Sequence, residues 1–380
     1  MSNDAPQCWY TQLTPTGRGA VAVIGLHGQD AARHLQAFFR PATRRSLADA
    51  PLQQILFGRW QTDEHHAGEE LVLCRVAKDQ WEIYPHGGSA AVEAISVALA
   101  AVGCEAIDFK KWCELSGIKP TQQEPLQRLA DCRTEREAAL LLDQYRGAWS
   151  RARTELRQLI ARGAWSELKQ RLTRLHFLYR YAEHLGQPYR VVLVGAPNVG
   201  KSRLINALVG YDRSIVFDQP GTTRDIVTAM TALDGWTFEF SDTAGLRQSA
   251  DPLEIEGMRR ATAQLQTADL VLLVRDATRP NEPLPALPPL DHPHEQLVLW
   301  NKCDLAAPPA AAHELTVSAA TQLHLSELQA TIVAKLCPHP PASGEAVPLV
   351  PSDMSLLTAM LQSLQRQDYA ALRDLANQLG

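Results

Sequence analysis

The segment from Gly195 to Ser202 has the residue types that bind phosphate. It reads G-x-x-x-x-G-K-S and lies between an apolar run at 191–194 and a helix-like run at 203–208. In a strand–loop–helix context, the backbone N–H groups of such a loop converge on phosphate oxygens, Lys201 neutralises their charge and Ser202 is placed to ligate Mg²⁺. The contacts expected from this segment are Asn198, Val199, Gly200, Lys201, Ser202 and Arg203.

Three further segments follow in chain order and complete a nucleotide site. At 242–245, after a strand-like run, a carboxylate can hold Mg²⁺ and a glycine N–H can meet a γ-phosphate. At 301–304, the Asp304 carboxylate can accept both N1–H and the exocyclic NH₂ of guanine, whereas adenine has an acceptor at N1. The last segment of the nucleotide site lies at 318–320. Together the four segments predict GTP or GDP as the ligand. The contacts expected are Asp242, Thr243, Ala244, Gly245, Asn301, Lys302, Asp304, Ser318, Ala319 and Ala320.

The elements that must position these segments alternate strands with helices from Tyr189 to about Leu336. Runs that are apolar on both faces, such as 191–194 and 270–274, indicate a mostly parallel sheet covered by helices. The proline-rich stretches at 280–293 and 338–351 are interpreted as a loop and a linker.

The rest of the chain predicts different architecture on either side. Strand-like runs at 21–24, 71–73 and 81–84, with an alanine-rich helix from Ser89 to Gly103, indicate a small α+β domain. Helix-spaced leucines follow from about Glu124. A long helix is expected at 164–185, and one amphipathic helix is expected from Asp353 onward, packed on the earlier helical block.

At 380 residues the chain is long enough for two or three cores. The predicted fold is therefore multidomain. It comprises an α+β N-terminal domain at 1–110, the first part of an α-helical domain at 111–187, an inserted α/β P-loop GTPase domain of the Ras-like kind at 188–337, and a linker with the returning helix of the helical domain at 338–380.

Composition excludes several classes of protein. A net charge of −5, with 45% hydrophobic and 21% charged residues, excludes wholesale disorder and a protein that coats nucleic acid through its overall field. The seven cysteines are scattered without C-x-x-C, and the histidines lack metal-site spacing, so the sequence indicates neither a disulfide framework nor a zinc site. The N-terminus has no secretory signal and no run spans a membrane, which predicts a cytoplasmic protein.

Several segments resemble the tRNA-modification GTPase family MnmE (TrmE), within the larger class that includes Era and Der. In the predicted G domain they are Asn198, the G-T-T-R-D stretch at 221–225 and the D-T-A-G-L-R stretch at 242–247. Near the N-terminus, T-P-T-G-R-G-A at 14–20 is similar to the family's T-P-P-G-R-G-G opening, and H-G-G at 86–88 is similar to its H-G-G. The resemblance covers nearly the whole chain.

The resemblance implies Mg²⁺-dependent GTP hydrolysis in which two G domains dimerise. Leu246 stands where Ras-like enzymes have a water-orienting glutamine. The family pattern implies that a K⁺ ion supplies the charge of an arginine finger, that Glu254 orients water indirectly, and that Glu254 and Lys201 are the catalytic residues. The implied Mg²⁺ ligands are Ser202 and Thr223, and the implied K⁺ and switch-loop contacts are Asn198, Phe217, Gln219, Gly221 and Thr222.

The chain departs from the family at five places, one of which is the segment 106–112, where the family's G-E-F-T-x-R-A-F-x-N-G-K stretch is missing. Phe217 stands where the family has threonine, and Pro220 makes the switch sequence closer to Der. Gly25 occupies the place of an arginine expected for folate binding, so folate binding is not expected. The sequence ends without the family's Cys-x-Gly-Lys tail, so the chain is identified as a divergent member.

Three functions stay open from the sequence. The first is GTP hydrolysis linked to tRNA wobble-uridine modification or to a derived role. The second is a ribosome-assembly GTPase of the Era/Der kind, which Pro220 favours. The third is a nucleotide-responsive scaffold with little hydrolysis, which Leu246 favours.

The segment 146–180 carries nine Lys and Arg residues against two Glu. A helix face of this kind can hold the backbone of tRNA or ribosomal RNA by counterion release. It can equally be a solvated face, or one that pairs with acidic side chains. The partners expected are therefore RNA at this segment, a second copy of the chain as a homodimer, and a partner protein of a modification complex, with no membrane.

Overall fold

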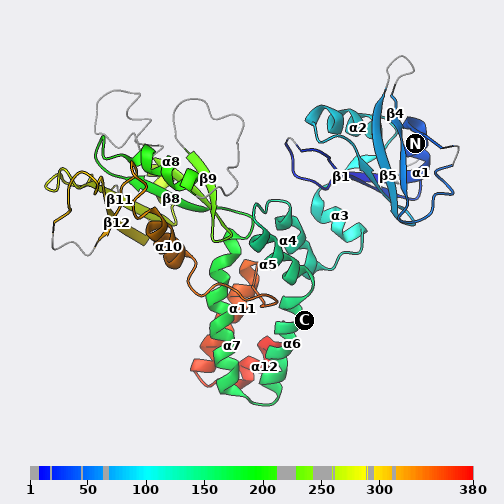
Figure 1. The fold of residues 1–380 in the computed structure, drawn as a ribbon. Helices are drawn as coiled ribbons and strands as arrows, with labels where there is room; N and C mark the ends of the chain where they lie inside the picture. Colours follow the sequence, from blue (N-terminus) through cyan, green and yellow to red (C-terminus); the bar gives the residue numbers. More distant parts are fainter. Residues whose placement is uncertain are drawn as a thin grey trace. The chain divides into compact units, whose positions relative to one another are not determined.

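The computed structural model describes residues 8–17, 19–43, 46–62, 68–211, 228–242, 259, 262–287, 289, 295–309 and 314–379. Contacts divide the chain into two units, one formed by 1–131 with 145–147 and the other by 132–144 with 148–380 (Figure 1). Within the described residues, no helix has the length and apolar character needed to cross a bilayer.

The first unit is built on a seven-stranded sheet in the order β3-β4-β5-β6-β2-β1-β7. All neighbours are antiparallel except β1 and β7, which are parallel. Its strands are β1 (Cys8–Gln12), β2 (Ile24–Gly28), β3 (Phe39–Pro41), β4 (Ile55–Trp60), β5 (Glu69–Ala77), β6 (Gln80–Tyr84) and β7 (Glu105–Ala106). Its helices are α1 (Ala31–Phe38), α2 (Ser89–Ala101), α3 (Phe109–Leu115) and α4 (Pro120–Leu129).

The strand predicted at 21–24 is wrong in its position, because β2 begins only at Ile24. The backbone before it is engaged elsewhere: the Val23 N–H donates to Thr14 Oγ1 at 3.1 Å. The Gly19 N–H donates to the Gly87 carbonyl at 3.0 Å. A Cβ on Gly87 would lie 2.3 Å from the Gly19 carbonyl oxygen, so glycine is required there. The two N-terminal stretches that resemble the family are thus in direct contact.

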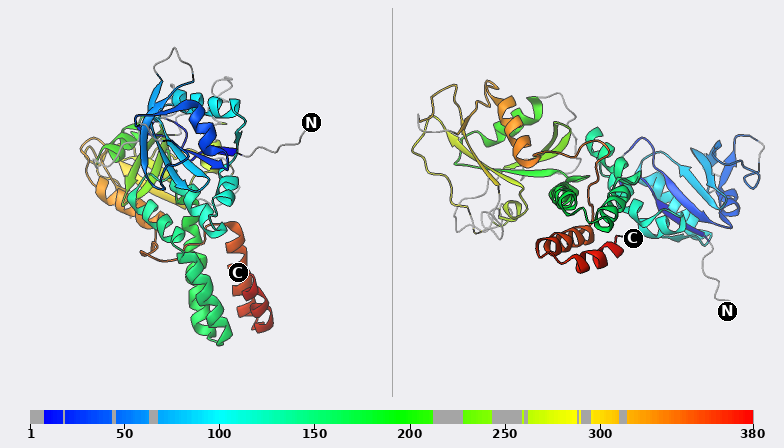
Figure 2. Two further views of the ribbon diagram at one scale, coloured as in Figure 1. Left: turned by 90° about the vertical axis from the view of Figure 1, so that its right-hand side faces the viewer. Right: turned by 90° about the horizontal axis from the view of Figure 1, so that it is seen from below.

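The second unit contains a helical part whose two pieces lie far apart in the sequence. Its elements are α5 (Glu135–Tyr145), α6 (Ala148–Ala161), α7 (Trp165–Leu178), the 3₁₀ helix η1 (Tyr179–His184), α11 (Pro351–Gln365) and α12 (Tyr369–Asn377). Helix α11 packs on α7 and α12 packs on α6 (Figure 2). Leucines from all four helices share one buried core, for example Leu156, Leu172, Leu357 and Leu372. The prediction that the C-terminal segment packs on the earlier helical block is confirmed.

Two local predictions in this part are wrong. The α-helix predicted at 164–185 ends at Leu178 and continues as 3₁₀ helix. The single helix expected from Asp353 is two helices, because Gln367 adopts φ +57° and the Asp368 carboxylate caps α12 by accepting from the Ala371 N–H. Proline at 351 opens α11, as a residue without an N–H can at a first helical position.

The stretch 338–351 is packed against helices and is not a free linker. Val347 is fully buried, and its N–H donates to Gln144 Oε1 at 3.0 Å. The Tyr181 hydroxyl donates to the Pro338 carbonyl at 2.6 Å. The chain therefore returns to the helical part beside the point where it left.

The rest of the second unit is a six-stranded sheet in the order β13-β12-β11-β8-β10-β9. Every neighbouring pair is parallel except β9 with β10, which confirms the predicted mostly parallel sheet. Helices α8 (Lys201–Tyr211) and α10 (Leu325–Leu336) pack against each other, and α8 contacts β9 and β10. The strands are β8 (Tyr189–Val194), β9 (Thr228–Leu233), β10 (Trp236–Asp242), β11 (Leu270–Asp276), β12 (Glu295–Asn301) and β13 (Leu315–Thr316).

Candidate functional site

The phosphate-binding loop joins the end of β8 to the start of α8, as the sequence predicts. Two of its glycines are fixed by close contacts. A Cβ on Gly195 would lie 2.4 Å from the Val274 carbonyl oxygen. A Cβ on Gly200, which has φ +96°, would lie 2.5 Å from Asn301 Nδ2. Both positions therefore exclude any side chain, and Gly200 also has a backbone conformation that favours glycine.

Lys201 is buried inside the loop, with 9% of its surface exposed. Its Nζ donates to the carbonyl oxygens of Gly195 at 3.0 Å and Ala196 at 3.3 Å. The same nitrogen lies 3.8 Å from Asp242 Oδ1. A single positive charge is thus held where the loop's N–H groups and the start of α8 favour an anion.

Ser202 and Asp242 form a second pair at the loop. The Ser202 hydroxyl donates to Asp242 Oδ2 at 2.6 Å. Asp242 ends β10, which pairs in parallel with β8, so the carboxyl ends of both strands meet here. Asp242 Oδ1 is buried without a hydrogen-bond partner among the described residues. A hydroxyl and a carboxylate with an unused oxygen are ligands that Mg²⁺ prefers, so the side chains present fit this ion.

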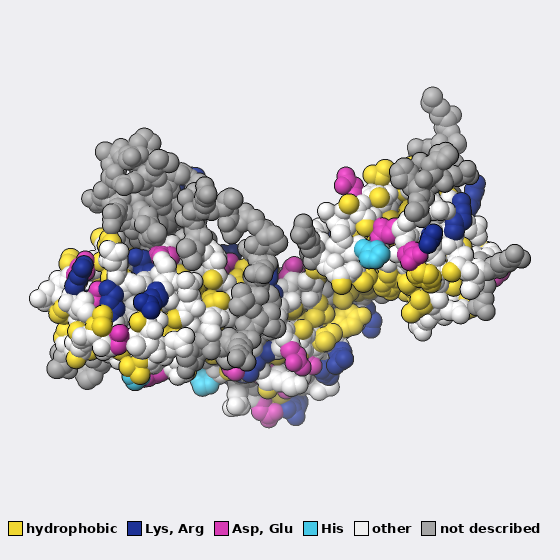
Figure 3. Space-filling model, turned by 45° about the horizontal axis from the view of Figure 1, so that its top comes forward, with side chains coloured by type: hydrophobic (Ala, Val, Ile, Leu, Met, Phe, Trp, Pro, Cys, Tyr) yellow, Lys and Arg dark blue, Asp and Glu magenta, His cyan; other side chains and the backbone are white. Residues whose placement is uncertain are grey.

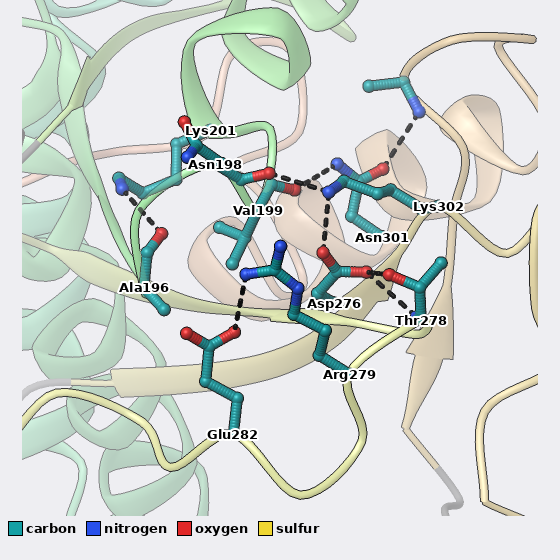
Figure 4. A network of polar contacts seen from close by, with 11 residues as sticks. Ala196, Asn198, Val199, Lys201, Asp276, Thr278, Arg279, Glu282, Asn301 and Lys302 are labelled. Carbon is teal, nitrogen blue, oxygen red and sulfur yellow. Dashed lines mark hydrogen bonds and ion pairs between the residues drawn. The ribbon is translucent and has the colours of Figure 1, made fainter.

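Asn301, the last residue of β12, and Lys302 contact the backbone of the phosphate loop (Figure 4). Asn301, 2% exposed, donates from Nδ2 to the Val199 carbonyl at 2.8 Å. Its Oδ1 accepts from the Ala319 N–H at 3.1 Å, which ties the 318–320 segment to the same asparagine. Lys302 Nζ donates to the Asn198 carbonyl at 2.7 Å. Two successive carbonyls of the loop are thereby fixed by two successive side chains.

Asp276 belongs to this network although the sequence reasoning missed it. It ends β11, is 3% exposed, and accepts from Lys302 Nζ at 2.6 Å and from the Thr278 hydroxyl at 2.6 Å. Burial opposes ionisation, but these hydrogen bonds hold the pKa of Asp276 below its usual value. The signal in the sequence that pointed to it was an acidic residue two positions after the apolar run at 270–274, at the carboxyl end of the strand.

Other expected contacts lie at the surface or outside the described residues. Asn198, Ser202, Arg203 and Asp304 are exposed, and Asn198 has φ +64°. The remaining expected switch and catalytic residues have no described structure: Phe217, Gln219, Gly221, Thr222, Thr223, Thr243, Ala244, Gly245 and Glu254.

A buried carboxylate connects the helical part to the strands beside the site. Glu137, at the start of α5 and 1% exposed, accepts the Thr237 N–H of β10 at 2.8 Å. Burial raises the pKa of Glu137 above its usual value. Thr134 Oγ1 donates to the Gly235 carbonyl at 2.6 Å, and Arg136 pairs with Asp234 at 3.0 Å. The tip of the β9–β10 hairpin is therefore held by α5, while β10 ends in the carboxylate that contacts Ser202.

The predicted basic segment is partly neutralised by neighbouring carboxylates. Arg162 pairs with Glu167, Arg171 with Glu155 and Arg174 with Glu345, at 2.6, 3.0 and 2.8 Å respectively. Over the whole face that Figure 3 draws, Lys and Arg side chains are interspersed with Asp and Glu. Within the basic segment, Arg151, Arg162 and Lys169 are exposed. The helices thus combine arginines that hold the fold with others that face solvent.

Known proteins resemble this chain at two levels, over the segment that contains the phosphate loop and over most of the chain. A family model described as 50S ribosome-binding GTPase matches residues 190–302. A tRNA modification GTPase MnmE of Xanthomonas campestris pv. campestris (strain B100) is 32% identical, with 97% of this chain and 89% of that protein covered. The protein of the same name from Synechococcus sp. (strain RCC307) is 31% identical, with 84% and 78% covered.

One solved structure also shares sequence with the chain. It is Era in complex with MgGDPNP and nucleotides of 16S ribosomal RNA, at 30% identity and a TM-score of 0.32, with 45% of this chain and 63% of that chain covered.

Proposed function

Because the chain belongs to the family of tRNA modification GTPases named MnmE, we propose that it hydrolyses GTP and acts in the modification of tRNA. The observation that supports GTP hydrolysis is that Lys201, Ser202 and Asp242 lie in contact at one phosphate loop. The relatives named MnmE cover up to 97% of the chain, whereas the 50S ribosome-binding model matches the GTPase domain alone. This difference in coverage favours tRNA modification over ribosome assembly.

In the proposed reaction the residues of the chain bind GTP, orient it and neutralise the charge of its phosphates. Lys201 and the loop N–H groups bind the β- and γ-phosphates, and Asp304, exposed beside the loop, accepts the guanine N1–H and NH₂. Ser202 and Asp242, with Thr223 proposed from the family pattern, would hold Mg²⁺, which supplies positive charge to the phosphates when bound. Water attacks the γ-phosphorus, and the bond to the β-phosphate oxygen breaks to give GDP and phosphate.

We assign the remaining charge and water positioning to K⁺ and Glu254. Leu246 has no hydrogen-bonding group, so a water molecule needs another orienting residue. The Asn198 side chain is exposed, and within the part of the chain that the structure describes Lys302 contacts only the backbone carbonyl of Asn198, so we assign the side chain to K⁺. The other proposed K⁺ contacts are Phe217, Gln219, Gly221 and Thr222, and the active form is proposed to be a homodimer.

Phosphate release from GTP tests the hydrolysis. Lys201→Ala should abolish turnover, whereas Lys110→Ala, at an exposed position of the other unit, should leave it unchanged. Tight GTP binding by the unmodified chain without phosphate release, at high protein concentration and in KCl, would establish the scaffold alternative instead. Equal rates in KCl and NaCl would remove K⁺ from the proposal. Glu254→Ala should slow turnover far more than Glu256→Ala, two positions further along the chain.

The tRNA role is tested by deleting the gene and analysing wobble nucleosides by mass spectrometry. Loss of a modified wobble uridine, restored by the intact gene and not by the Lys201→Ala gene, is the expected result. An unchanged nucleoside profile together with co-sedimentation of the protein with ribosomal subunits would favour ribosome assembly.

For RNA contact we propose the solvent-facing side of α6 and α7. Lys169 is exposed there. Lys169→Ala should reduce the slope of tRNA affinity against salt by about one unit if it neutralises a phosphate. An unchanged slope would remove this face from the proposed RNA contact.

A further inference from the structure

Three side chains that bind soft metal ions meet in the first unit, which does not contain the phosphate loop. They are Cys8 of β1, His34 of α1 and Cys104, the residue directly before β7. One ligand atom from each, two sulfurs and a ring nitrogen, lie within 4.8 Å of one another. No other group of three or more His, Cys, Asp or Glu side chains is as close among the residues that the structure describes.

The topology of the sheet accounts for this meeting. Strands β1 and β7 are parallel neighbours with Trp9 opposite Glu105, so Cys8 and Cys104 stand side by side one residue earlier. Strand β2 runs antiparallel to β1 with Gly28 opposite Cys8, and the chain enters α1 three residues later. The first turn of α1 therefore brings His34 over the same end of β1.

The local backbone fixes the position of Cys104. Gly103, with φ +90°, ends the turn after α2, and the Cys104 N–H donates to the Leu99 carbonyl at 3.1 Å. Cys8 is 1% exposed and Cys104 is 5% exposed, whereas His34 is half-buried. The cluster thus has an apolar floor that holds both sulfurs and a side open to solvent at the imidazole.

The two thiols share a hydrogen bond, and their pKa values are shifted in opposite directions. That hydrogen bond and burial raise the pKa of Cys8 far above its usual value, and the Asp30 carboxylate adds to the effect. The same hydrogen bond lowers the pKa of Cys104.

We propose that Cys8, His34 and Cys104 form a zinc-binding site. Zn–S and Zn–N bonds are about 2.3 and 2.1 Å long, so in tetrahedral geometry two sulfurs on one ion lie about 3.8 Å apart, and a sulfur and a nitrogen about 3.6 Å. The observed limit of 4.8 Å is within reach of small side-chain rotations. Two thiolates and an imidazole are a donor set for Zn²⁺ and not for Mg²⁺ or Ca²⁺. A water molecule would complete the set of four ligands.

The proposed ion would tie β1, α1 and β7 together and would be linked to thiol deprotonation. Binding releases the protons of both thiols, so affinity rises with pH. Because an ion that binds only the folded form stabilises it, added Zn²⁺ should raise the unfolding temperature of the first unit.

Cobalt replacement tests the site on the full chain, purified without a histidine tag, reduced and treated with a chelator. One equivalent of Co²⁺ should produce thiolate-to-cobalt absorption and the visible bands of tetrahedral Co²⁺, and Zn²⁺ should abolish both. Cys8→Ser and Cys104→Ser should each weaken Co²⁺ binding and lower the thiolate-to-cobalt absorption of the bound ion, because one of the two sulfurs is lost. His34→Gln, at a half-buried position that tolerates change, should weaken Co²⁺ binding at least about tenfold. Cys74→Ser, a thiol of the same unit outside the cluster, is the matched control and should behave as the unmodified chain.

Three results would overturn the proposal. The first is no thiolate-to-cobalt absorption in the unmodified chain. The second is absorption of unchanged intensity in both cysteine variants, together with unchanged Co²⁺ affinity in His34→Gln. The third is a Cys8–Cys104 disulfide, found by alkylation and mass spectrometry in protein freshly isolated from its own cells, which would make the pair a redox site. GTP turnover resides in the other unit and should be unaffected by all of these variants, so the zinc site and the GTPase proposal fail or stand separately.

Discussion

Glu137→Ala should destabilise the second unit by about 2 kcal/mol. The change removes the acceptor of the Thr237 N–H and leaves that buried donor unsatisfied, which costs about 1–3 kcal/mol. The hydrogen bond from the Arg133 N–H is long, at 3.4 Å, and adds little. Removal of a buried charge offsets part of the loss. For a unit of this size, about 2 kcal/mol corresponds to a fall in the unfolding temperature of about 4–8 °C.

The matched control is Glu135→Ala, an exposed residue of the same helix. It should change stability by no more than about 0.5 kcal/mol. Denaturant unfolding followed by tryptophan fluorescence is a suitable assay, because Trp236 lies in the hairpin held by α5, 5.2 Å from Tyr181 between ring centroids. Equal destabilisation by the two variants would refute the assigned role of Glu137.

The pH dependence of stability gives a second readout of the same contact. Because burial raises the pKa of Glu137 in the folded chain, the folded state binds its proton more tightly than the unfolded state. The contribution of Glu137 to the free energy of unfolding is therefore complete at pH values below its pKa in the unfolded chain. It is lost as the pH rises through its pKa in the folded chain. Glu137→Gln keeps an acceptor for Thr237 and cannot titrate, so its stability should fall less than that of the unmodified chain between pH 4 and pH 7. Identical pH profiles would contradict this reasoning.

Three further predictions concern the nucleotide site. Gly200→Ala places a Cβ 2.5 Å from Asn301 Nδ2 at a φ of +96°, and it should abolish GTP binding in calorimetry, whereas Gly210→Ala, which meets open space in α8, should bind GTP normally. Asp304→Asn should lower GTP affinity about 10- to 150-fold through loss of charge-assisted hydrogen bonds and should favour xanthosine triphosphate in competition assays. Lys302→Met removes the hydrogen bond to the loop carbonyl and should weaken GDP binding in fluorescence titration, with no such effect from Lys335→Met.

The phosphate loop could be predicted from sequence because it is local. Eight consecutive residues, an apolar strand before them and a helix after them define both its shape and its charge. The same holds for the sheet, whose strands are apolar on both faces. Where helices end was harder to predict, because the break at Gln367 depends on a single backbone angle that the leucine pattern does not record.

The contacts that sequence could not reveal are those made between distant segments. Glu137 resembles any acidic residue in the first turn of a helix, and only the position of β10 makes it a buried acceptor. Cys8 and Cys104 show no metal-site spacing, yet parallel pairing of β1 and β7 makes them neighbours. In each case the sheet topology, and not the local composition, determines the chemistry.

The hydrogen bond from the Tyr181 hydroxyl to the Pro338 carbonyl has a consequence for the modularity of the chain. It places the departure and return of the inserted GTPase domain beside each other, so the helical part is closed on itself whatever the insert contains. A chain in which a short glycine–serine turn replaces residues 188–337 should still pair α7 with α11 and α6 with α12. We therefore expect that the GTPase domain can be replaced by another domain whose two chain ends lie close together, without loss of the helical fold.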